Sequence, residues 1–89
     1  MTTIYAIPDT VVARELGDEL VLLDLKAGTY FGLDPVGAVI WQAIDGSATF
    51  DDLCGAALAE FEVEEAVLRR DVAELVETLE GKGLVIRQG

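Results

Sequence analysis

TYFGLDPVGAVIW, residues 29–41, is the stretch that decides the fold. Its first five residues, Thr29–Leu33, are of the types that favour β-strands. Asp34 and Pro35 then have the character of a helix start, with Asp34 as the N-cap and Pro35 at the first helical position. The apolar residues that follow recur at helical spacing. We therefore predict a strand that ends at Leu33 and a helix that begins directly after it.

Two further strands are predicted upstream of this stretch. Residues 11–15 (VVARE) form the first, and residues 20–25 (LVLLDL) form the second. Gly17 and Asp18 between them are a two-residue hairpin signal, and Gly28 is free to take the positive φ that the next turn needs. The three strands are expected to form an antiparallel meander.

Three helices are predicted downstream. The first ends before Gly46. The second is capped by Thr49, with Asp52 three residues on as a weak capping box. The third spans roughly Val63–Glu80, with Gly81 as its C′ residue. The order of three strands and three helices predicts an α+β, winged helix-turn-helix-like fold, in which a three-stranded antiparallel sheet is followed by three helices.

Length and composition predict one small domain. The chain has 89 residues, 52% of them hydrophobic, which suffices for a single domain over residues 1–89 with its core at about 10–86. No apolar stretch approaches the ~20 residues that cross a bilayer. The N-terminus has neither the basic nor the apolar region of a secretion signal. We expect a soluble, cytoplasmic protein.

Charge and residue types exclude several function classes. The chain has 17 acidic and 6 basic residues, hence a net charge of −11, and such a surface repels nucleic acids and anionic membranes. It has no histidine, which is the commonest general base and metal ligand. The single cysteine, Cys54, cannot form an internal disulfide or a thiolate zinc site, and is expected to pack as a small buried hydrophobe. We therefore predict a non-catalytic binding module without a cofactor or a metal.

The strand at residues 29–33 has an edge that the sequence leaves unprotected. Edge strands usually carry charge, proline or a bulge, whereas this strand has no charged residue and no proline. Such an edge is either covered or used, and a familiar use is the addition of a partner's strand. From the residues alone both readings stay open. In the first reading, the extended piece at residues 84–86 or a second copy of the chain covers the edge. In the second reading, the edge binds a peptide.

The predicted third helix carries two neighbouring stripes. The first is apolar, is expected to be core, and comprises Leu68, Val72, Leu75 and Leu79. The second mixes apolar and polar residues and comprises Val67, Asp71, Glu74, Leu75 and Thr78. Such a stripe suits the wall of a peptide-binding groove, and it is equally compatible with a solvated face beside the core.

The second half of the chain is strongly acidic. Residues 45–80, beginning with Asp45, hold eleven acidic residues and only two basic ones, Arg69 and Arg70. This segment would steer a basic partner, or it is simply a solubilising surface. The shortage of basic residues on the third helix argues against DNA recognition.

Three segments together resemble the PqqD-like proteins over about residues 10–86. These are the strand at residues 11–15, the ordered string YFGLDP-x-G-x-x-I-W at residues 30–41, and the helix ending DVAELVETLEGKGLV at residues 71–85. The resemblance implies a RiPP recognition element, a small domain that binds the leader region of a ribosomally made precursor peptide. In that family the leader is added as an antiparallel strand on the third strand, and its side chains enter a groove against the third helix.

The resemblance also implies which residues bind the leader. The edge would be supplied, mainly through the backbone, by Thr29, Tyr30, Phe31, Gly32 and Leu33. The helix wall would be formed by Val67, Leu68, Asp71, Leu75 and Thr78.

Within the family, the free-standing form and the run YFGLDP look most like the lasso-peptide branch. There the domain delivers the precursor to a leader peptidase of the cysteine-protease type, before a macrolactam cyclase acts. Two alternatives remain. One is a PqqD-type chaperone that presents a precursor to a radical-SAM enzyme, and the other is a dimerisation or enzyme-subunit module without peptide binding.

Overall fold

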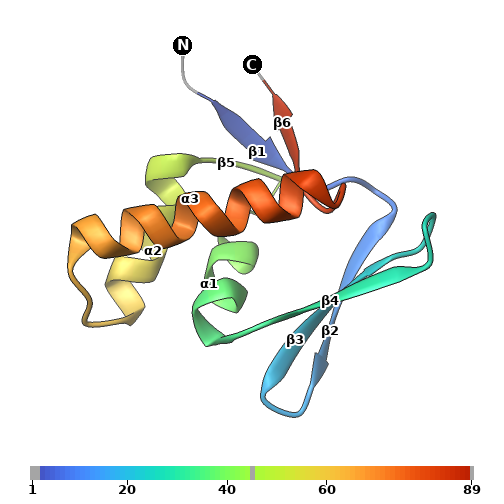
Figure 1. Cartoon of the computed structure of the whole chain (residues 1–89), viewed down its shortest axis with the longest axis horizontal. Helices are drawn as coiled ribbons and strands as arrows, with labels where there is room; N and C mark the ends of the chain where they lie inside the picture. Colours follow the sequence, from blue (N-terminus) through green and yellow to red (C-terminus); the bar gives the residue numbers. More distant parts are fainter. Residues whose placement is uncertain (1–2, 45, 89) are drawn as a thin grey trace.

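The computed structural model describes residues 3–44 and 46–88; Asp45, counted above with the acidic segment, lies outside them. Figure 1 shows two small sheets beside a group of three helices. In chain order the elements are β1 (Ile4–Ala6), β2 (Val11–Leu16), β3 (Glu19–Asp24), β4 (Thr29–Leu33), α1 (Pro35–Ala43), β5 (Ser47–Thr49), α2 (Phe50–Glu60), α3 (Glu65–Gly81) and β6 (Ile86–Gln88).

The predicted meander is confirmed. β2, β3 and β4 form an antiparallel sheet in that order, and β4 has the predicted bounds. Leu16 pairs with Glu19, so the first turn consists of two residues, in which Gly17 has a φ of 63°. Gly28 has a φ of 73° in the second turn. Both turns require the left-handed conformation, which glycine adopts without strain because it has no Cβ atom.

The starts of α1 and α2 follow the capping rules, whereas Glu64 at the start of α3 makes no side-chain cap hydrogen bond. Asp34 Oδ1 accepts a hydrogen bond of 2.7 Å from the Gly37 N–H, as expected of an N-cap before Pro35. At the start of α2 the capping box is complete, since the Thr49 hydroxyl accepts from the Asp52 N–H and the Asp52 carboxylate accepts from the Thr49 N–H. These contacts satisfy backbone donors that the first turn of a helix leaves unpaired.

The predicted C′ residue of the third helix is wrong by two positions. Gly81 still belongs to α3, and Lys82 keeps a helical backbone as the C-cap. The residue with positive φ is Gly83, at 74°, and the Leu84 N–H then donates to the Leu79 carbonyl at 2.9 Å. The glycine that closes the helix in the left-handed conformation is thus the second of the GKG run.

A second sheet was not predicted. β1 lies between β5 and β6 and pairs antiparallel with both. Each of these strands has only three residues, so none has enough length for an alternating pattern to be read. β6 pairs with β1, so of the alternatives that the sequence left open, coverage of the edge at residues 29–33 by the last extended piece is excluded.

The core lies between the inner faces of the sheets and the three helices. Trp41 and Cys54 are buried in it, 5% and 1% exposed. α3 contributes four buried residues, Leu68, Val72, Val76 and Leu79. No helix within residues 3–44 and 46–88 is long and apolar enough to span a membrane.

Candidate functional site

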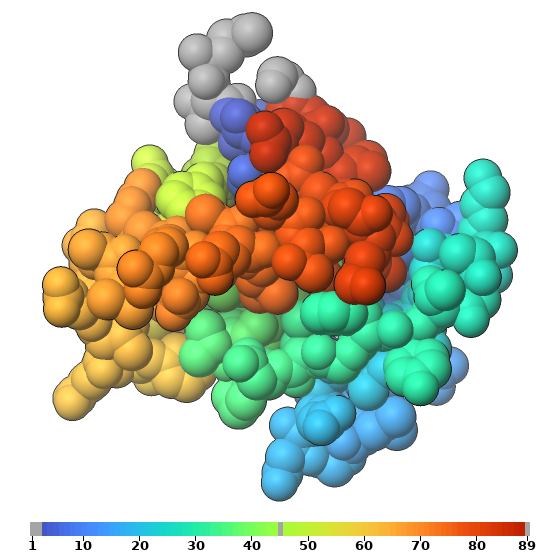
Figure 2. Space-filling model, in the orientation of Figure 1, coloured from blue at the N-terminus to red at the C-terminus, as the bar shows by residue number. Residues whose placement is uncertain are grey.

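The outer edge of β4 is open. β4 is the last strand of its sheet, and no other strand of the described residues pairs with its outer side. In the space-filling view, α3 crosses the face of the molecule with β4 and α1 directly beneath it (Figure 2). The edge therefore runs alongside a helix and a strand-to-helix junction.

The hydrogen-bonding pattern shows which backbone groups point outward from this edge. The Leu25 N–H donates to the Thr10 carbonyl at 2.8 Å, one step beyond the pair Val11–Asp24. Because bonded and non-bonded pairs alternate in an antiparallel ladder, the backbone groups of Asp24 point to the other side, toward Thr29 of β4.

The same alternation along β4 separates its residues into two sets. Thr29, Phe31 and Leu33 direct their N–H and C=O groups toward β3. Tyr30 and Gly32 direct theirs away from the sheet. An added strand would thus exchange backbone hydrogen bonds with Tyr30 and Gly32.

The side chains of β4 alternate between the two faces of the sheet. Leu33 is buried and Phe31 half-buried on the face toward the helices, where Phe31 packs against the core. Tyr30 lies on the opposite face and is 77% exposed. A peptide side chain opposite Phe31 would therefore point toward α1 and α3.

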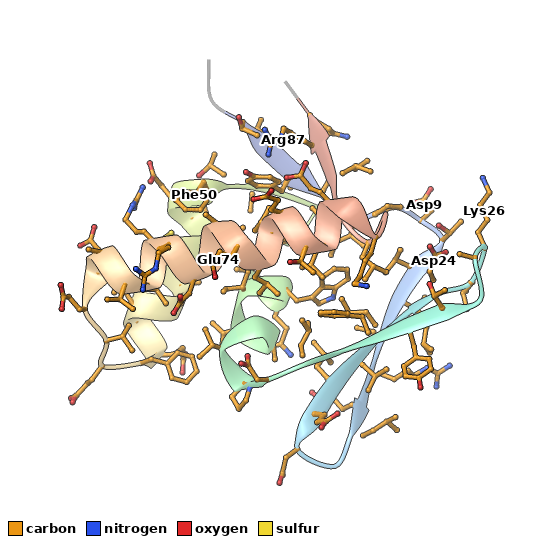
Figure 3. All side chains as sticks on the ribbon, in the orientation of Figure 1. Asp9, Asp24, Lys26, Phe50, Glu74 and Arg87 are labelled. Atoms are coloured by element: carbon orange, nitrogen blue, oxygen red, sulfur yellow. The ribbon has the colours of Figure 1, made fainter. Side chains whose placement is uncertain are left out.

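A groove of about 360 Å³ lies on that side of β4. It is lined by residues from β4, the start of α1 and the middle of α3. They are Phe31, Asp34, Val36, Gly37, Ile40, Asp71, Glu74, Leu75 and Thr78. Glu74 lies on the part of α3 that passes in front of α1 (Figure 3).

Gly37 allows α1 to lie against β4. A Cβ atom at this position would be 3.1 Å from Leu33 Cδ2, closer than ordinary van der Waals contact. Gly37 also donates to Asp34, so the same residue closes the helix cap and lines the groove. The glycine of the DPxG string is thus explained by close packing rather than by positive φ.

The groove has an apolar floor and an acidic rim. Phe31, Val36, Ile40 and Leu75 supply apolar surface, and three carboxylates, those of Asp34, Asp71 and Glu74, lie at its border. Its lining contains no Lys or Arg among the described residues. The Thr78 hydroxyl donates to the Glu74 carbonyl at 3.0 Å, so it presents its lone pairs and methyl group. This site suits an apolar side chain accompanied by a cation or a hydrogen-bond donor.

The structure brings most of the expected residues together. Phe31, Asp71, Leu75 and Thr78 line the groove. Thr29 and Tyr30 line an adjoining cavity of about 240 Å³ with Phe31, Lys82 and Leu84. Gly32 and Leu33 line a third cavity at the other end of β4.

Two expected wall residues lie elsewhere. Leu68 is 3% exposed and belongs to the core, and Val67 is 41% exposed and lies outside the groove lining. Conversely, the whole α1 wall was missed, although Val36 and Ile40 are spaced i, i+4, as two residues on one helix face must be.

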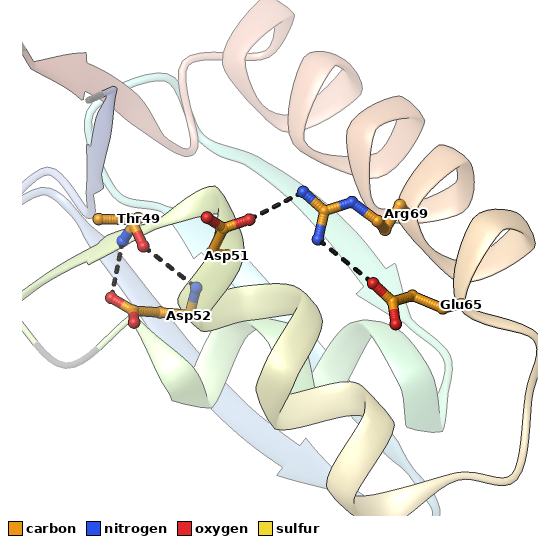
Figure 4. A network of polar contacts seen from close by, with 5 residues as sticks. All are labelled: Thr49, Asp51, Asp52, Glu65 and Arg69. Atoms are coloured by element: carbon orange, nitrogen blue, oxygen red, sulfur yellow. Dashed lines mark hydrogen bonds and ion pairs between the residues drawn. The ribbon is translucent and has the colours of Figure 1, made fainter. Parts of the chain in front are cut away.

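A polar network fixes the first half of α3 on α2. Arg69 forms an ion pair of 2.8 Å with Asp51 and lies 4.0 Å from Glu65 (Figure 4). Its guanidinium also lies 5.1 Å from the ring centroid of Phe50. The hydrogen bond that Arg69 donates to Asp51 raises the pKa of Arg69. Part of the acidic segment is thus used to position α3, which carries one wall of the groove.

A second contact fixes the other end of α3. Arg87 of β6 donates to Glu80 at 2.8 Å, and its guanidinium lies 5.7 Å from the ring centroid of Tyr5. The hydrogen bond to Glu80 raises the pKa of Arg87. The second sheet therefore holds the C-terminal part of α3 in place.

Cys54 is buried on α2, away from the groove. Burial raises the pKa of its thiol, and the nearby Arg69 partly opposes that shift. Such a thiol is a poor nucleophile at neutral pH. Within the described part of the chain, no three His, Cys, Asp or Glu side chains are grouped so that they could hold a metal ion.

Fold and site together define a small α+β domain with an open edge strand beside a groove. Residues 19–85 match the sequence model of the family described as coenzyme PQQ synthesis protein D (PqqD). The chain therefore belongs to the PqqD family, and the resemblance in its sequence is confirmed. No curated protein matches the chain.

Two solved structures share the fold. The first is TbiB1 in complex with the TbiA(beta) leader peptide, which is 38% identical, with a TM-score of 0.80 over 90% of this chain and 93% of that one. The second is lasso peptide synthetase B1 complexed with the leader peptide, which is 29% identical, with a TM-score of 0.79 over 92% of this chain and 96% of that one.

Proposed function

We propose that this protein is a RiPP recognition element that binds the leader region of a ribosomally made precursor peptide. The observation that carries the proposal is the open edge of β4, with the backbone groups of Tyr30 and Gly32 directed outward beside the groove. Both solved relatives are complexes with leader peptides, which supports the same role here.

The leader would bind by strand addition. Its backbone pairs with Tyr30 and Gly32, and every second side chain faces α3 and the groove. Main-chain hydrogen bonds hold the peptide in extended form, while the groove selects among side chains. The edge is held in position mainly by the pairing of Thr29, Phe31 and Leu33 with β3. The wall of the groove on α3 is formed by Asp71, Leu75 and Thr78.

The precursor would be that of a lasso peptide, since one relative is a lasso peptide synthetase B1. In this role the protein acts in the cytoplasm and delivers the precursor to a leader peptidase of the cysteine-protease type and then to a macrolactam cyclase. It performs no chemistry itself, since it has no histidine and its buried Cys54 thiol has a raised pKa. Purified protein should therefore leave a precursor uncut.

A second candidate is a role in coenzyme synthesis, which the family description names. In that role the protein would present a precursor to a radical-SAM enzyme. Leader binding is common to both candidates, so the choice depends on the enzyme that uses the complex. Adding either a leader peptidase or a radical-SAM enzyme to the complex, and following the precursor by mass spectrometry, distinguishes them.

The test of leader binding is a titration. A fluorescein-labelled leader of a candidate precursor peptide is titrated with the protein, and binding is followed by fluorescence anisotropy. Saturable binding with one leader per chain is expected, and light scattering gives the stoichiometry. A dimer that forms without peptide and excludes the leader would instead identify the β4 edge as a subunit interface.

A further inference from the structure

The charges beside the β4 edge are ordered along the strand. α3 runs alongside β4 in the opposite direction (Figure 1). As a result, Lys82 at the end of the helix shares a cavity with Thr29. Asp71 in the middle of the helix shares the groove with Asp34, which follows Leu33.

The Thr29 end of the edge holds a cation, Lys82, whose Nζ lies 5.5 Å from the centroid of the Phe31 ring. Among the described residues, none that lines the cavity there is acidic. The Asp24 carboxylate, across from Thr29 on β3, accepts hydrogen bonds from the Lys26 and Ala27 N–H groups in the turn. Within residues 3–44 and 46–88, Lys82 forms no ion pair. Its charge is therefore available to a peptide on the edge. Lys26, in the preceding turn, points away from α3 (Figure 3).

The Leu33 end of the edge is acidic on every side. Asp34, Asp71 and Glu74 border the groove. The cavity beyond it, which is lined by Gly32 and Leu33, adds the carboxylates of Asp18 and Glu19. Neither cavity has a basic residue in its described lining.

The order of charges along β4, together with strand geometry, predicts a sequence pattern for the bound peptide. Peptide side chains that face α3 are those opposite Thr29, Phe31 and Leu33, because alternate residues share a face. The outer two of these positions are four residues apart, a span of about 13 Å at roughly 3.3 Å per residue. A cation opposite Leu33 then meets carboxylates, an apolar side chain opposite Phe31 meets the groove floor, and an acid opposite Thr29 meets Lys82.

We propose that the site reads the order of charges along its peptide and thereby fixes the direction of the added strand. This inference rests on the proposed function. Antiparallel pairing is the commoner arrangement in sheets, and for an antiparallel peptide the pattern reads basic–x–apolar–x–acidic from N- to C-terminus. Reversing the peptide places its acid against the carboxylates and its base against Lys82, so both charges are repelled. Asp71 and Lys82 are thus the specificity-determining residues at the two ends.

The experiment is a selection from a yeast-displayed library of random 12-residue peptides, in which the sorting probe is fluorescently labelled protein. Wild type and the double variant Asp71→Lys, Lys82→Glu are used in parallel, and far-UV circular dichroism checks that both are folded. Clones that also bind Gly32→Pro are removed, so that only peptides on the β4 edge are counted. Glu74→Lys with Lys82→Glu serves as a second charge-swapped variant.

We expect wild type to enrich the basic–x–apolar–x–acidic order about tenfold over its reverse, because like-charge contacts select strongly against the wrong partner. The charge-swapped variants should lose this preference, because Lys82→Glu makes the Thr29 end acidic while the other carboxylates remain at the Leu33 end. The inference is overturned if wild type enriches edge-binding peptides with no charge order or with the acid first. It is also overturned if the swapped variants enrich the same order as wild type. Neither result counts against leader binding. Failure of wild type to enrich any edge-binding peptide counts against strand addition itself.

Discussion

Lys82 lies over the aromatic ring of Phe31, with its ammonium nitrogen 5.5 Å from the ring centroid. The pair joins the C-cap of α3 to the middle of β4, and its two residues are 51 positions apart in the chain. A cation over an aromatic face is attracted by the ring quadrupole. Through this contact the end of α3 stays beside the edge strand that the proposed peptide would extend.

Gly32→Pro should abolish leader binding. The Gly32 N–H points away from the sheet, so proline deletes a donor to the peptide while the ladder to β3 stays intact. Gly32→Ala keeps the N–H and should bind within about twofold of wild type, since a Cβ there meets only the flexible end of Glu19 at 3.3 Å. Fluorescence anisotropy measures both. Normal binding by folded Gly32→Pro would place the added strand elsewhere.

Asp34→Ala should lower the free energy of unfolding by about 1 kcal/mol, because it removes the cap hydrogen bond to Gly37. It should also weaken leader binding, since Asp34 borders the groove. Thr49→Ala is the matched control, because it removes the cap of α2 outside the groove lining. Urea unfolding should show similar losses for both variants, with a binding loss for Asp34→Ala alone. Equal binding by the two would exclude Asp34 from the site.

Leu75→Ala should make the free energy of leader binding less favourable by about 2 kcal/mol or more, because Leu75 lines the proposed anchor pocket. Leu75 is half-buried, packs against the core and lines the groove. Val76→Ala truncates the next residue, which is 2% exposed and lies outside the groove lining. Both variants should be less stable. Comparable binding losses in isothermal titration would trace the effect to stability rather than to the groove.

Asp71→Asn should weaken leader binding by about 1 kcal/mol, the size of one partly exposed charged contact. Added salt should reduce the difference from wild type. Glu62→Gln is the control, because Glu62 is exposed, forms no ion pair among the described residues and lies outside the groove lining. Titrations at low and high salt compare the two variants. Equal losses would leave only a diffuse effect of the acidic surface.

Stability should fall at alkaline pH partly because of Cys54. Burial raises the pKa of its thiol in the folded protein, so the unfolded thiol ionises first as pH rises. The contribution of this thiol to the free energy of unfolding is complete below the pKa of the thiol in the unfolded chain. It is lost as the pH rises through the pKa of the thiol in the folded protein. Urea unfolding between pH 7 and about pH 10 should show a smaller decline for Cys54→Ala. Parallel declines for wild type and variant would contradict this assignment.

The local signals around β4 predicted their part of the fold closely. Thr29–Leu33 is a strand and Pro35 starts a helix because a β-prone run ends at an N-cap whose hydrogen bond reaches only three residues ahead. The capping box at Thr49 and the turn at Gly28 are local for the same reason. Interactions within a few residues of one another can be read from sequence without knowing what the chain packs against.

The second sheet, the open edge of β4 and the groove were decided only by the tertiary structure, because they depend on residues that are far apart in the chain. β1 exists because Tyr5 pairs with Ala48 on one side and Arg87 on the other, and three-residue strands have no periodicity to reveal them. The exposure of the β4 edge was undecided from sequence, because it depended on whether β6 joined β4 or β1. The groove needed α1 to approach β4 at Gly37, and α3 to turn Leu75, but not Leu68, toward the gap. The sequence alone predicted the meander and the three helices, whereas long-range packing determined the second sheet and which edges and faces were left open for a partner.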